Sequence, residues 1–394
     1  MASPEQKDFF SNITPIFFLA GIVFFNFLSR LIFSPLLLTF EKDFNLNHAQ
    51  AGSLFLLISI GYSITMFLSG FVSSRIAHRK TILLSALISG LSFFVISSSS
   101  TLVGFKIGLV TLGIGCGFYF PSGIAIITSL IEAKKLGKAL GLHELGPNLA
   151  YVLAPVIAEL FLGFTSWRII LMVLGSANLL MAVVFGFFGQ GGHFPGEAPR
   201  LRNLRKMLSQ TSFWIIIIFF SLAAAGTIGV YSIIPTYLVV ERGMDQATAN
   251  TLFSLSRISV LFVILLAGYL VDRVGTKLSI GIIMGTAGLT TILLGLTTNL
   301  GLIIVVLIQP VLISSFFPAG FAAISKIAPP RMHNLAVSVI LPFSVLFGGG
   351  IIPATLGLLG EYSSFSTGFV LLGGLTMTSA VIPFFLKYPE FKKE

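Results

Sequence analysis

The chain has 394 residues, of which 55% are hydrophobic and 10% are charged, and its mean hydropathy is +0.99. Soluble domains carry about 25% charged residues, so this chain cannot cover a water-facing surface, and a soluble enzyme is excluded. A net charge of +10 would favour nucleic acid as the partner of a soluble protein, but here it indicates basic loops on one side of a membrane. We predict a polytopic helical membrane protein that binds no nucleic acid.

Twelve apolar stretches are long enough to cross a lipid bilayer, since a transmembrane helix needs about 20 residues to cross roughly 30 Å of hydrocarbon. The first stretch lacks the features of a cleaved signal peptide, so we expect it to remain as a helix. The sequence therefore predicts an all-α membrane protein with twelve transmembrane helices. The stretches cover residues 14–40, 52–73, 81–98, 102–130, 139–162, 169–189, 213–240, 250–271, 278–297, 301–325, 335–359 and 366–386.

The longest connector, 190–212, contains glycine, proline and four basic residues. We interpret it as a cytoplasmic linker between an N-terminal six-helix bundle, 1–189, and a C-terminal six-helix bundle, 213–394. Cytoplasmic loops carry an excess of Lys and Arg. With the N-terminus inside, eighteen of the 24 Lys and Arg residues face the cytoplasm, three face the other side and three lie within spans. Both termini are therefore predicted on the cytoplasmic side of the inner membrane.

The two halves of the sequence resemble each other in register. A shift of 198 positions places Arg75 on Arg273 and Pro155 on Pro353, and nearly the same shift aligns further apolar and glycine positions. A general likeness among apolar helices does not explain why polar loop residues match at one offset. The repeat predicts two pseudo-symmetric six-helix bundles, a plan that many secondary transporters use.

The loop after the eighth span contains Gly268-x-x-x-Asp272-Arg273-x-Gly275-x-Lys277. It resembles the signature loop of the major facilitator superfamily, which joins helices 8 and 9. The counterpart loop between helices 2 and 3 is a weaker copy in this chain. The resemblance covers the whole chain and implies a secondary transporter that works by alternating access and is not an enzyme.

The weaker copy keeps Arg75 but has Ser74 and Ala77 where the family has Asp and Gly. A carboxylate at a helix end can accept hydrogen bonds from a neighbouring helix N-terminus and can pair with arginine. The resemblance therefore implies a gating latch on the cytoplasmic side, formed by Asp272, Arg273 and Arg75.

Two arginines lie inside predicted spans, where an ionisable side chain costs roughly 2.5–3.5 kcal/mol and needs a partner. At a rise of 1.5 Å per residue, Arg30 lies about 5 Å and Arg257 about 6 Å from the middle of its helix, in both cases towards the non-cytoplasmic side. Neither has an acidic residue at its own level. Each arginine can bind backbone carbonyls and only stabilise packing. The interpretation that we favour is that the two guanidinium groups, one from each half, grip one small organic anion.

The fifth span contains His143 and Glu144 next to each other, and Asn148 and Tyr151 share a helix face with Glu144. A membrane glutamate beside a histidine can carry a proton, because histidine titrates near neutral pH. We predict His143 and Glu144 as the proton-coupling pair and Asn148 and Tyr151 as substrate-binding residues. The alternative is that His143 and Glu144 only bond to a neighbouring helix.

Further substrate-binding residues are predicted on helices 1, 4, 7 and 10, because the family resemblance implies that these helices line the central cavity. Tyrosine, glutamine and asparagine near the middle of a span can hydrogen-bond a small ligand, although each can equally be a packed interface residue. The candidates within about 7 Å of the middle are Asn26, Tyr119, Tyr231 and Gln309.

Three functions remain open. The first is transport of a small carboxylate-type anion, with the proton as coupling ion. The second is proton-coupled export of drugs, which Gly146-Pro147 favours because it partly resembles a motif of drug antiporters, although small residues also serve close helix packing. The third is a membrane sensor, for which the sequence contains no signalling domain. No nucleotide-binding motif or metal-ligand spacing occurs, so we expect neither cofactor nor metal, and we expect a monomer.

Overall fold

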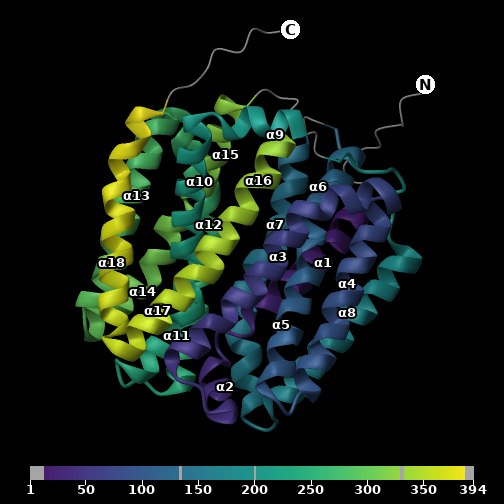
Figure 1. The fold of residues 1–394 in the computed structure, drawn as a ribbon. Coiled ribbons are helices and arrows are strands. Elements are labelled where there is room, and N and C mark those ends of the chain that lie inside the picture. Colours follow the sequence, from purple (N-terminus) through teal and green to yellow (C-terminus); the bar gives the residue numbers. More distant parts are fainter. Residues whose placement is uncertain (1–12, 133–134, 199–200, 329–331, 387–394) are drawn as a thin grey trace, which may run out of the picture. The chain divides into compact units, whose positions relative to one another are not determined.

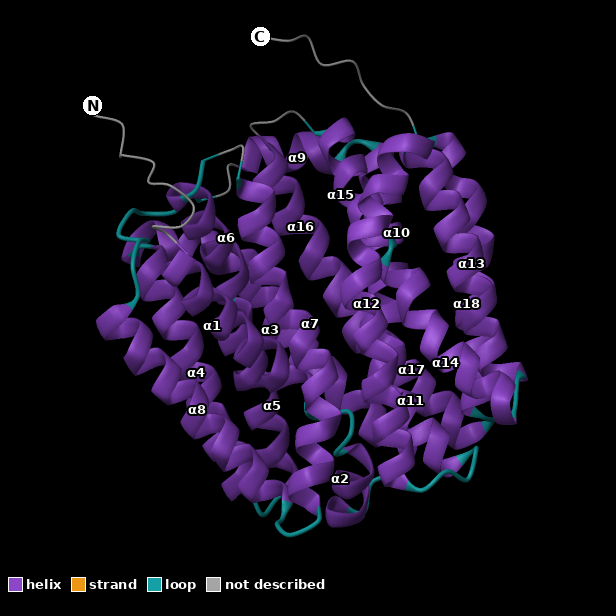
Figure 2. Cartoon of the chain, turned by 180° about the vertical axis from the view of Figure 1, so that it is seen from behind, coloured by secondary structure: helices purple, strands orange, loops and turns teal. Residues whose placement is uncertain are grey.

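The computed structural model describes residues 13–132, 135–198, 201–328 and 332–386, and within these ranges every secondary-structure element is a helix (Figures 1 and 2). The chain divides into two compact units. The first unit consists of Met1–Phe33 and Leu57–Pro199, and the second consists of Ser34–Leu56 and Arg200–Glu394. The predicted linker at 190–212 was based on its length and on its glycine, proline and basic residues, and it stays a prediction.

In the first unit, α1 packs along α7, and α4 packs along α5 and α8. The α1–α7 contact is close because Gly146 has no side chain, and a Cβ atom there would lie 2.5 Å from the carbonyl oxygen of Ala20. The helices of this unit are α1 (Ile13–Leu31), most of α3 (His48–Ile76), α4 (His78–Ser98), α5 (Leu102–Gly117), α6 (Tyr119–Leu130), α7 (Leu136–Leu162) and α8 (Trp167–Phe188).

In the second unit, two of the long helices contain a five-residue π-helical segment. Such segments form i→i+5 hydrogen bonds and are frequent at functional sites. The elements of this unit are α2 (Leu37–Phe44), the start of α3, α9 (Leu201–Leu208), α10 (Thr211–Ala224), η2 (Ala225–Gly229), α11 (Val230–Val240), α12 (Gln246–Val274), α13 (Thr276–Leu296), α14 (Asn299–Ser314), α15 (Phe316–Ile327), α16 (His333–Leu346), η4 (Phe347–Ile351), α17 (Ile352–Tyr362), α18 (Phe365–Thr378) and η5 (Ser379–Phe385).

The segment Ser34–Leu56 belongs to the second unit because it packs on α17. A Cβ atom at Gly52 would lie 2.6 Å from the carbonyl oxygen of Pro353, so the two backbones are in direct contact. The backbone N–H of His48 donates to Glu361 Oε2 at 2.9 Å, and the His48 ring contacts Glu41 at 2.9 Å. The first bond attaches the start of α3 to the end of α17, and the second attaches it to α2.

Eleven described helices, or pairs of consecutive helices, are long and apolar enough to cross a membrane. The twelfth predicted span, 250–271, lies in α12, where several side chains fall outside the described residues. The fold is therefore the predicted all-α membrane architecture, but the first span differs from the prediction 14–40. The chain turns at 32–36 because Pro35 lacks an N–H and disfavours helical geometry in the residue before it, so Arg30 lies in the last turn of α1.

The sequence repeat is visible in the helix boundaries. A shift of 198 carries α3 onto α12 and α4 onto α13 at both ends, and a shift of 197 carries α5 and α6 onto α14 and α15. The change by one residue falls in the loop between α4 and α5, which corresponds to the loop between α13 and α14. The two halves therefore share one local folding pattern.

The signature loop shows the same correspondence in its backbone. Gly275 has φ 89° and ψ 150°, and Ala77, its counterpart 198 residues earlier, has φ 68° and ψ 159°. This region of φ and ψ is nearly restricted to glycine, and another residue there costs about 1–3 kcal/mol. Ala77 is therefore a strained residue at a position where the repeat requires glycine.

We expect Ala77→Gly to stabilise the protein by about 1 kcal/mol, because it removes this strain at the cost of a more flexible unfolded chain. Gly275→Ala, the matched control in the other half, is expected to destabilise it by at least as much. Thermal unfolding of the purified variants in detergent measures both effects. A lower melting temperature for Ala77→Gly than for the wild type would contradict this account of the loop.

Candidate functional site

Arg30 lies in the last turn of α1, and its guanidinium group is stacked on two aromatic rings. The guanidinium carbon lies 4.2 Å from the ring centre of Tyr62 on α3 and 4.5 Å from that of Phe27 on α1. The Nε atom is buried, and no described residue gives Arg30 a hydrogen bond or an ion pair. Cation–π contacts hold the group in place without neutralising its charge. Arg30 is therefore a positioned cation whose charge is uncompensated by the described residues.

Three further predicted residues belong to the same unit. Tyr151 on α7 contacts Phe27, with 6.4 Å between the ring centres, and lies close to the aromatic rings around Arg30. The amide of Asn26 is buried and donates to the carbonyl of Cys116 at 2.9 Å, joining α1 to α5. The amide of Asn148 donates to the carbonyl of Glu144 on its own helix at 2.8 Å. Tyr151 therefore lies near the rings around Arg30. The amide groups of Asn26 and Asn148 instead donate to backbone carbonyls, the first between two helices and the second within one helix.

Arg257 on α12 is buried in the second unit and has a different environment. Its Nη2 donates to the carbonyl of Thr227 at 3.1 Å, and its guanidinium lies 4.8 Å from the ring centre of Tyr231 and 5.9 Å from that of Phe253. Thr227 lies in η2, where the wider helical turn displaces backbone carbonyls from regular α-helical partners. Arg257 thus satisfies a carbonyl of the π-helical segment.

Gln309 on α14, like Arg257, donates to a backbone carbonyl of η2. Its Nε2 donates to the carbonyl of Gly226, also in η2, at 3.1 Å, and lies 3.3 Å from the hydroxyl of Thr291. A buried carbonyl without a donor would cost free energy, so Arg257 and Gln309 together stabilise η2. The sequence analysis did not predict this segment, although the run of small residues at 223–229 was a signal for irregular helix geometry.

Arg30 belongs to the first unit and Arg257 to the second, and each is described within its own unit. Their joint grip on one anion stays a prediction. Within the units, both arginines share a feature that the sequence did not reveal: each is stacked on a phenylalanine of its own helix and a tyrosine of a neighbouring helix.

His143 on α7 is fully buried and bonds to Tyr119 on α6. The distance from His143 Nε2 to the Tyr119 hydroxyl is 2.9 Å, and the two rings are nearly parallel. The Tyr119 hydroxyl also donates to the carbonyl of Leu19 on α1 at 2.7 Å. The other ring nitrogen, Nδ1, lies 3.3 Å from Oε1 of Glu144, whose side chain is 48% exposed. The predicted proton-coupling pair is thus in contact, and Tyr119 bonds to it.

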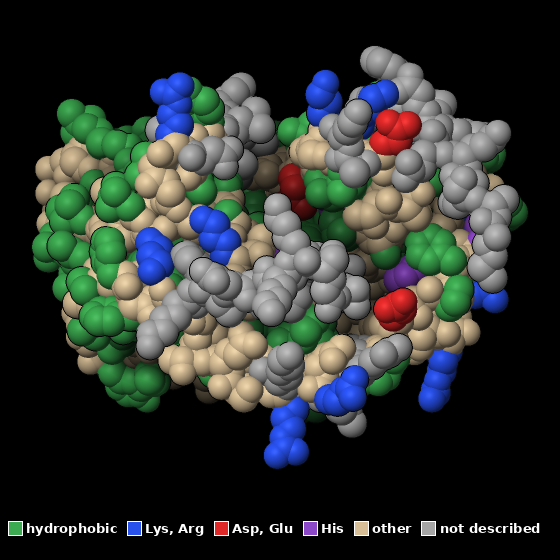
Figure 3. Space-filling view, turned by 90° about the horizontal axis from the view of Figure 1, so that it is seen from above, with side chains coloured by type: hydrophobic (Ala, Val, Ile, Leu, Met, Phe, Trp, Pro, Cys, Tyr) green, Lys and Arg blue, Asp and Glu red, His purple; other side chains and the backbone are tan. Residues whose placement is uncertain are grey.

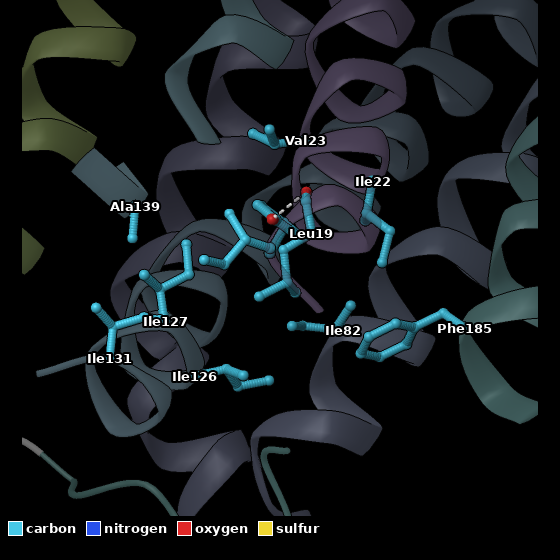
Figure 4. Packing of buried hydrophobic residues seen from close by; sticks show 11 residues of the cluster. Leu19, Ile22, Val23, Ile82, Ile126, Ile127, Ile131, Ala139 and Phe185 are labelled. Atoms are coloured by element: carbon cyan, nitrogen blue, oxygen red, sulfur yellow. Dashed lines mark hydrogen bonds between the residues drawn. The ribbon is translucent and has the colours of Figure 1, made fainter. Parts of the chain in front are cut away.

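Apolar side chains surround this hydrogen-bonded group. Figure 4 shows Leu19, Val23, Ile126 and Ala139 as part of one packed cluster from α1, α6 and α7. The cluster keeps Tyr119 and His143 away from solvent, while Glu144 reaches the surface of the unit.

The predicted gating latch is only partly described. Arg75 is exposed at the end of α3, and Arg273 is exposed with its guanidinium 4.7 Å from the ring centre of Tyr269. The side chain of Asp272 lies outside the described residues. The latch itself stays a prediction.

Arg79 binds the end of α8, a role that was not predicted from the sequence. Its guanidinium donates to the carbonyls of Gly189, Gly186 and Phe185, the last two at 2.9 and 3.2 Å. Its backbone N–H donates to Gly192 at the start of the linker at 2.8 Å. A cation at a helix C-terminus is stabilised by the helix dipole, and the glycines after Phe188 were the available signal.

Basic side chains surround the ends of the helices that carry these loops (Figure 3). Acidic side chains are few in this view. The described basic residues in the loops predicted to be cytoplasmic are Arg75, Arg79, Lys80, Lys135, Lys138, Arg202, Arg205, Arg273, Lys277 and Lys326.

Comparison with known proteins identifies relatives that match most of the chain. It is 21% identical over 367 residues to the cis,cis-muconate transport protein of Acinetobacter baylyi, covering 89% of this chain and 88% of that protein. It is 23% identical over 401 residues to the hexuronate transporter of Bacillus subtilis, covering 92% and 91%. It is also 22% identical to the multidrug resistance protein MdtL of Shewanella oneidensis, over 55% of each chain.

The fold is shared with solved structures of transporters. The crystal structure of a bacterial homolog of the human lysosomal transporter Spinster superposes with a TM-score of 0.78 over 96% of each chain, at 16% sequence identity. The family model of the Major Facilitator Superfamily matches residues 19–308 and 232–394. Together with the apolar helices and the repeated loop, this match shows that the chain belongs to the Major Facilitator Superfamily and is a multi-pass membrane transporter, not an enzyme.

Proposed function

We propose that this chain is a secondary active transporter that moves a small organic anion of the carboxylate type across the cytoplasmic membrane by alternating access, with protons as the coupling ion. The observation that carries the proposal is the environment of Arg30. Its planar guanidinium is held between Phe27 and Tyr62, and no described residue neutralises it. A carboxylate can supply both the charge and the two parallel acceptors that this group lacks.

The sequence relatives support an anion as substrate. The muconate and hexuronate transporters are named for organic anions, and each matches about nine-tenths of this chain. Arg257 is the second proposed ligand, because it is a buried arginine within a predicted span and its planar guanidinium suits a carboxylate. Tyr151, Tyr231 and Gln309 are proposed to surround the substrate.

The orientation is part of the same proposal. The basic helix ends of Figure 3 are proposed to face the cytoplasm, with both termini on that side, because basic loops are retained there. Arg79 and its neighbours then hold the linker 190–212 at the cytoplasmic surface. The protein is proposed to work as a monomer.

The second candidate is a proton-coupled exporter of drugs or other lipophilic compounds. It is favoured by the match to MdtL over 55% of the chain and by Gly146-Pro147 in α7. Gly146 has a sufficient packing role, since it permits the close approach of α7 to α1. A thermal-shift panel separates the two candidates, because a ligand that binds the folded state raises the melting temperature by mass action. Stabilisation by cationic drugs and not by carboxylates would favour the exporter.

We expect Arg30→Lys to weaken binding of muconate at least tens-fold, because lysine keeps the charge but loses the planar fork, and each charge-assisted hydrogen bond contributes about 1.5–3 kcal/mol. Arg30→Gln is expected to abolish binding. Isothermal titration calorimetry on the folded variants measures both. Arg168→Gln is a matched control, since Arg168 is also stacked on an aromatic ring, that of Trp167, at 4.2 Å. Unchanged affinity in Arg30→Gln would overturn the proposed anion site.

We expect Arg257→Gln to lose anion binding as well, and also to lower the melting temperature, because the carbonyl of Thr227 loses a charged donor. Measuring both the affinity for the anion and the melting temperature distinguishes a ligand role of Arg257 from a purely structural one. A variant that is less stable than the wild type but binds muconate normally would show that Arg257 only stabilises η2.

We expect Glu144→Gln to abolish uphill accumulation of muconate in proteoliposomes and to permit counterflow exchange, because exchange needs no net proton movement. Glu159→Gln is the matched control on the same helix, near its other end. Uphill transport at the wild-type rate in Glu144→Gln, at every pH tested, would remove Glu144 from the coupling mechanism.

A further inference from the structure

The hydroxyl of Tyr119 determines which nitrogen of His143 carries a proton. This hydroxyl has one hydrogen and two partners, the carbonyl of Leu19 at 2.7 Å and Nε2 of His143 at 2.9 Å. A carbonyl oxygen can only accept, so the tyrosine hydrogen points to Leu19. The hydroxyl oxygen is then the acceptor for His143, and Nε2 must carry the hydrogen of that bond.

The contact between His143 and Glu144 then needs one proton of its own. When Nε2 of neutral His143 carries the proton, Nδ1 carries only a lone pair. This Nδ1 atom lies 3.3 Å from Oε1 of Glu144. A lone pair and a carboxylate repel each other. The contact is stable in two equivalent forms, protonated Glu144 donating to Nδ1, or protonated His143 donating from Nδ1 to the carboxylate. Each form holds a single proton between the two side chains.

We propose that Tyr119 is a positioning residue that fixes the Nε2-protonated form of His143. His143 and Glu144 then hold one exchangeable proton between them, and the Glu144 carboxylate moves away from His143 when that proton is lost. The inference deepens the proposed proton coupling and rests on it. It assigns Tyr119 to the proton site, in place of the substrate-binding role predicted from the sequence.

Burial makes the site sensitive to that proton. His143 and Tyr119 are fully buried, and Tyr119 packs in the cluster of Leu19, Val23 and their apolar neighbours, so His143 cannot exchange its partners for water. Glu144 is 48% exposed and can turn to solvent. Loss of the proton therefore releases the carboxylate and leaves the histidine bonded to Tyr119.

The charged surroundings of the pair are limited in the described part of the first unit. From α6 the titratable group facing His143 is Tyr119, and from α7 it is Glu144. The side of α1 that faces the pair contributes the carbonyl of Leu19 and apolar side chains. Tyr62 on α3 lies within electrostatic range of both Glu144 and Arg30.

Nitrogen-15 NMR of the histidine-labelled protein tests the assignment directly, since ring nitrogens with and without a proton have different chemical shifts. His143→Gln identifies the His143 signals among those of the five histidines. We expect Nε2 to carry the proton across the whole pH range, and Nδ1 to change in a single step that Glu144→Gln alters. A neutral His143 with its proton on Nδ1 would overturn the proposal, and this measurement needs no variant at position 119.

Tyr119→Phe supplies the second test. Removal of the Tyr119 hydroxyl, the acceptor for Nε2, destabilises the charged form of His143 more than the neutral form. The proton affinity of the His143–Glu144 pair should therefore fall about three- to tenfold. The pH midpoint of muconate uptake should move to lower pH. The NMR spectrum should show a mixture of the two neutral forms. An unchanged tautomer in Tyr119→Phe would refute the positioning role. If the tautomer is as expected but Glu144→Gln still transports uphill, the proton site stands and the proposed coupling fails.

Discussion

The hydrocarbon core of a bilayer supplies no hydrogen bonds, so every backbone group in it must find its partner within the protein. The described chain meets this constraint with helices, and where a helix is irregular, side chains complete the bonding. Ser34, in the turn after α1, donates to the carbonyl of Tyr231 at 2.7 Å. Arg257 and Gln309 donate to two carbonyls of η2. Polar residues in the spans are therefore first of all partners for backbone groups, and a functional role needs a further observation.

Arg30 supplies such an observation. Its guanidinium is ordered by two aromatic rings, yet the described residues offer its charge no carboxylate and its nitrogens no acceptor. Arg257 has the same kind of aromatic stacking but also bonds to Thr227. Two arginines that the sequence could not distinguish thus have different environments. The guanidinium of Arg30 has no hydrogen-bond partner among the described residues, whereas that of Arg257 bonds to η2.

The sequence predicted the fold because membrane helices are defined by length, apolarity and the position of basic residues, all of which are properties of single segments. The offset of 198 found in the sequence also relates the observed helix boundaries of α12 and α13 to those of α3 and α4. The break after Leu31 and the segment η2 lie inside apolar stretches, so length and apolarity did not locate them, although Pro35 and the small residues at 223–229 are local signals. Tyr119 and His143 were both selected as polar residues, but their bond depends on the rotation of α6 relative to α7, which helical spacing within one segment does not determine.

The central claim is that the charge of a carboxylate, rather than its shape or apolar surface, is what the protein recognises. The most direct test compares thermal stabilisation of the wild-type protein by muconate and by its dimethyl ester, which has the same carbon skeleton without the charges. The account predicts that muconate raises the melting temperature in a concentration-dependent way and that the ester does not. Equal stabilisation by both compounds, or stabilisation by the ester alone, would contradict it.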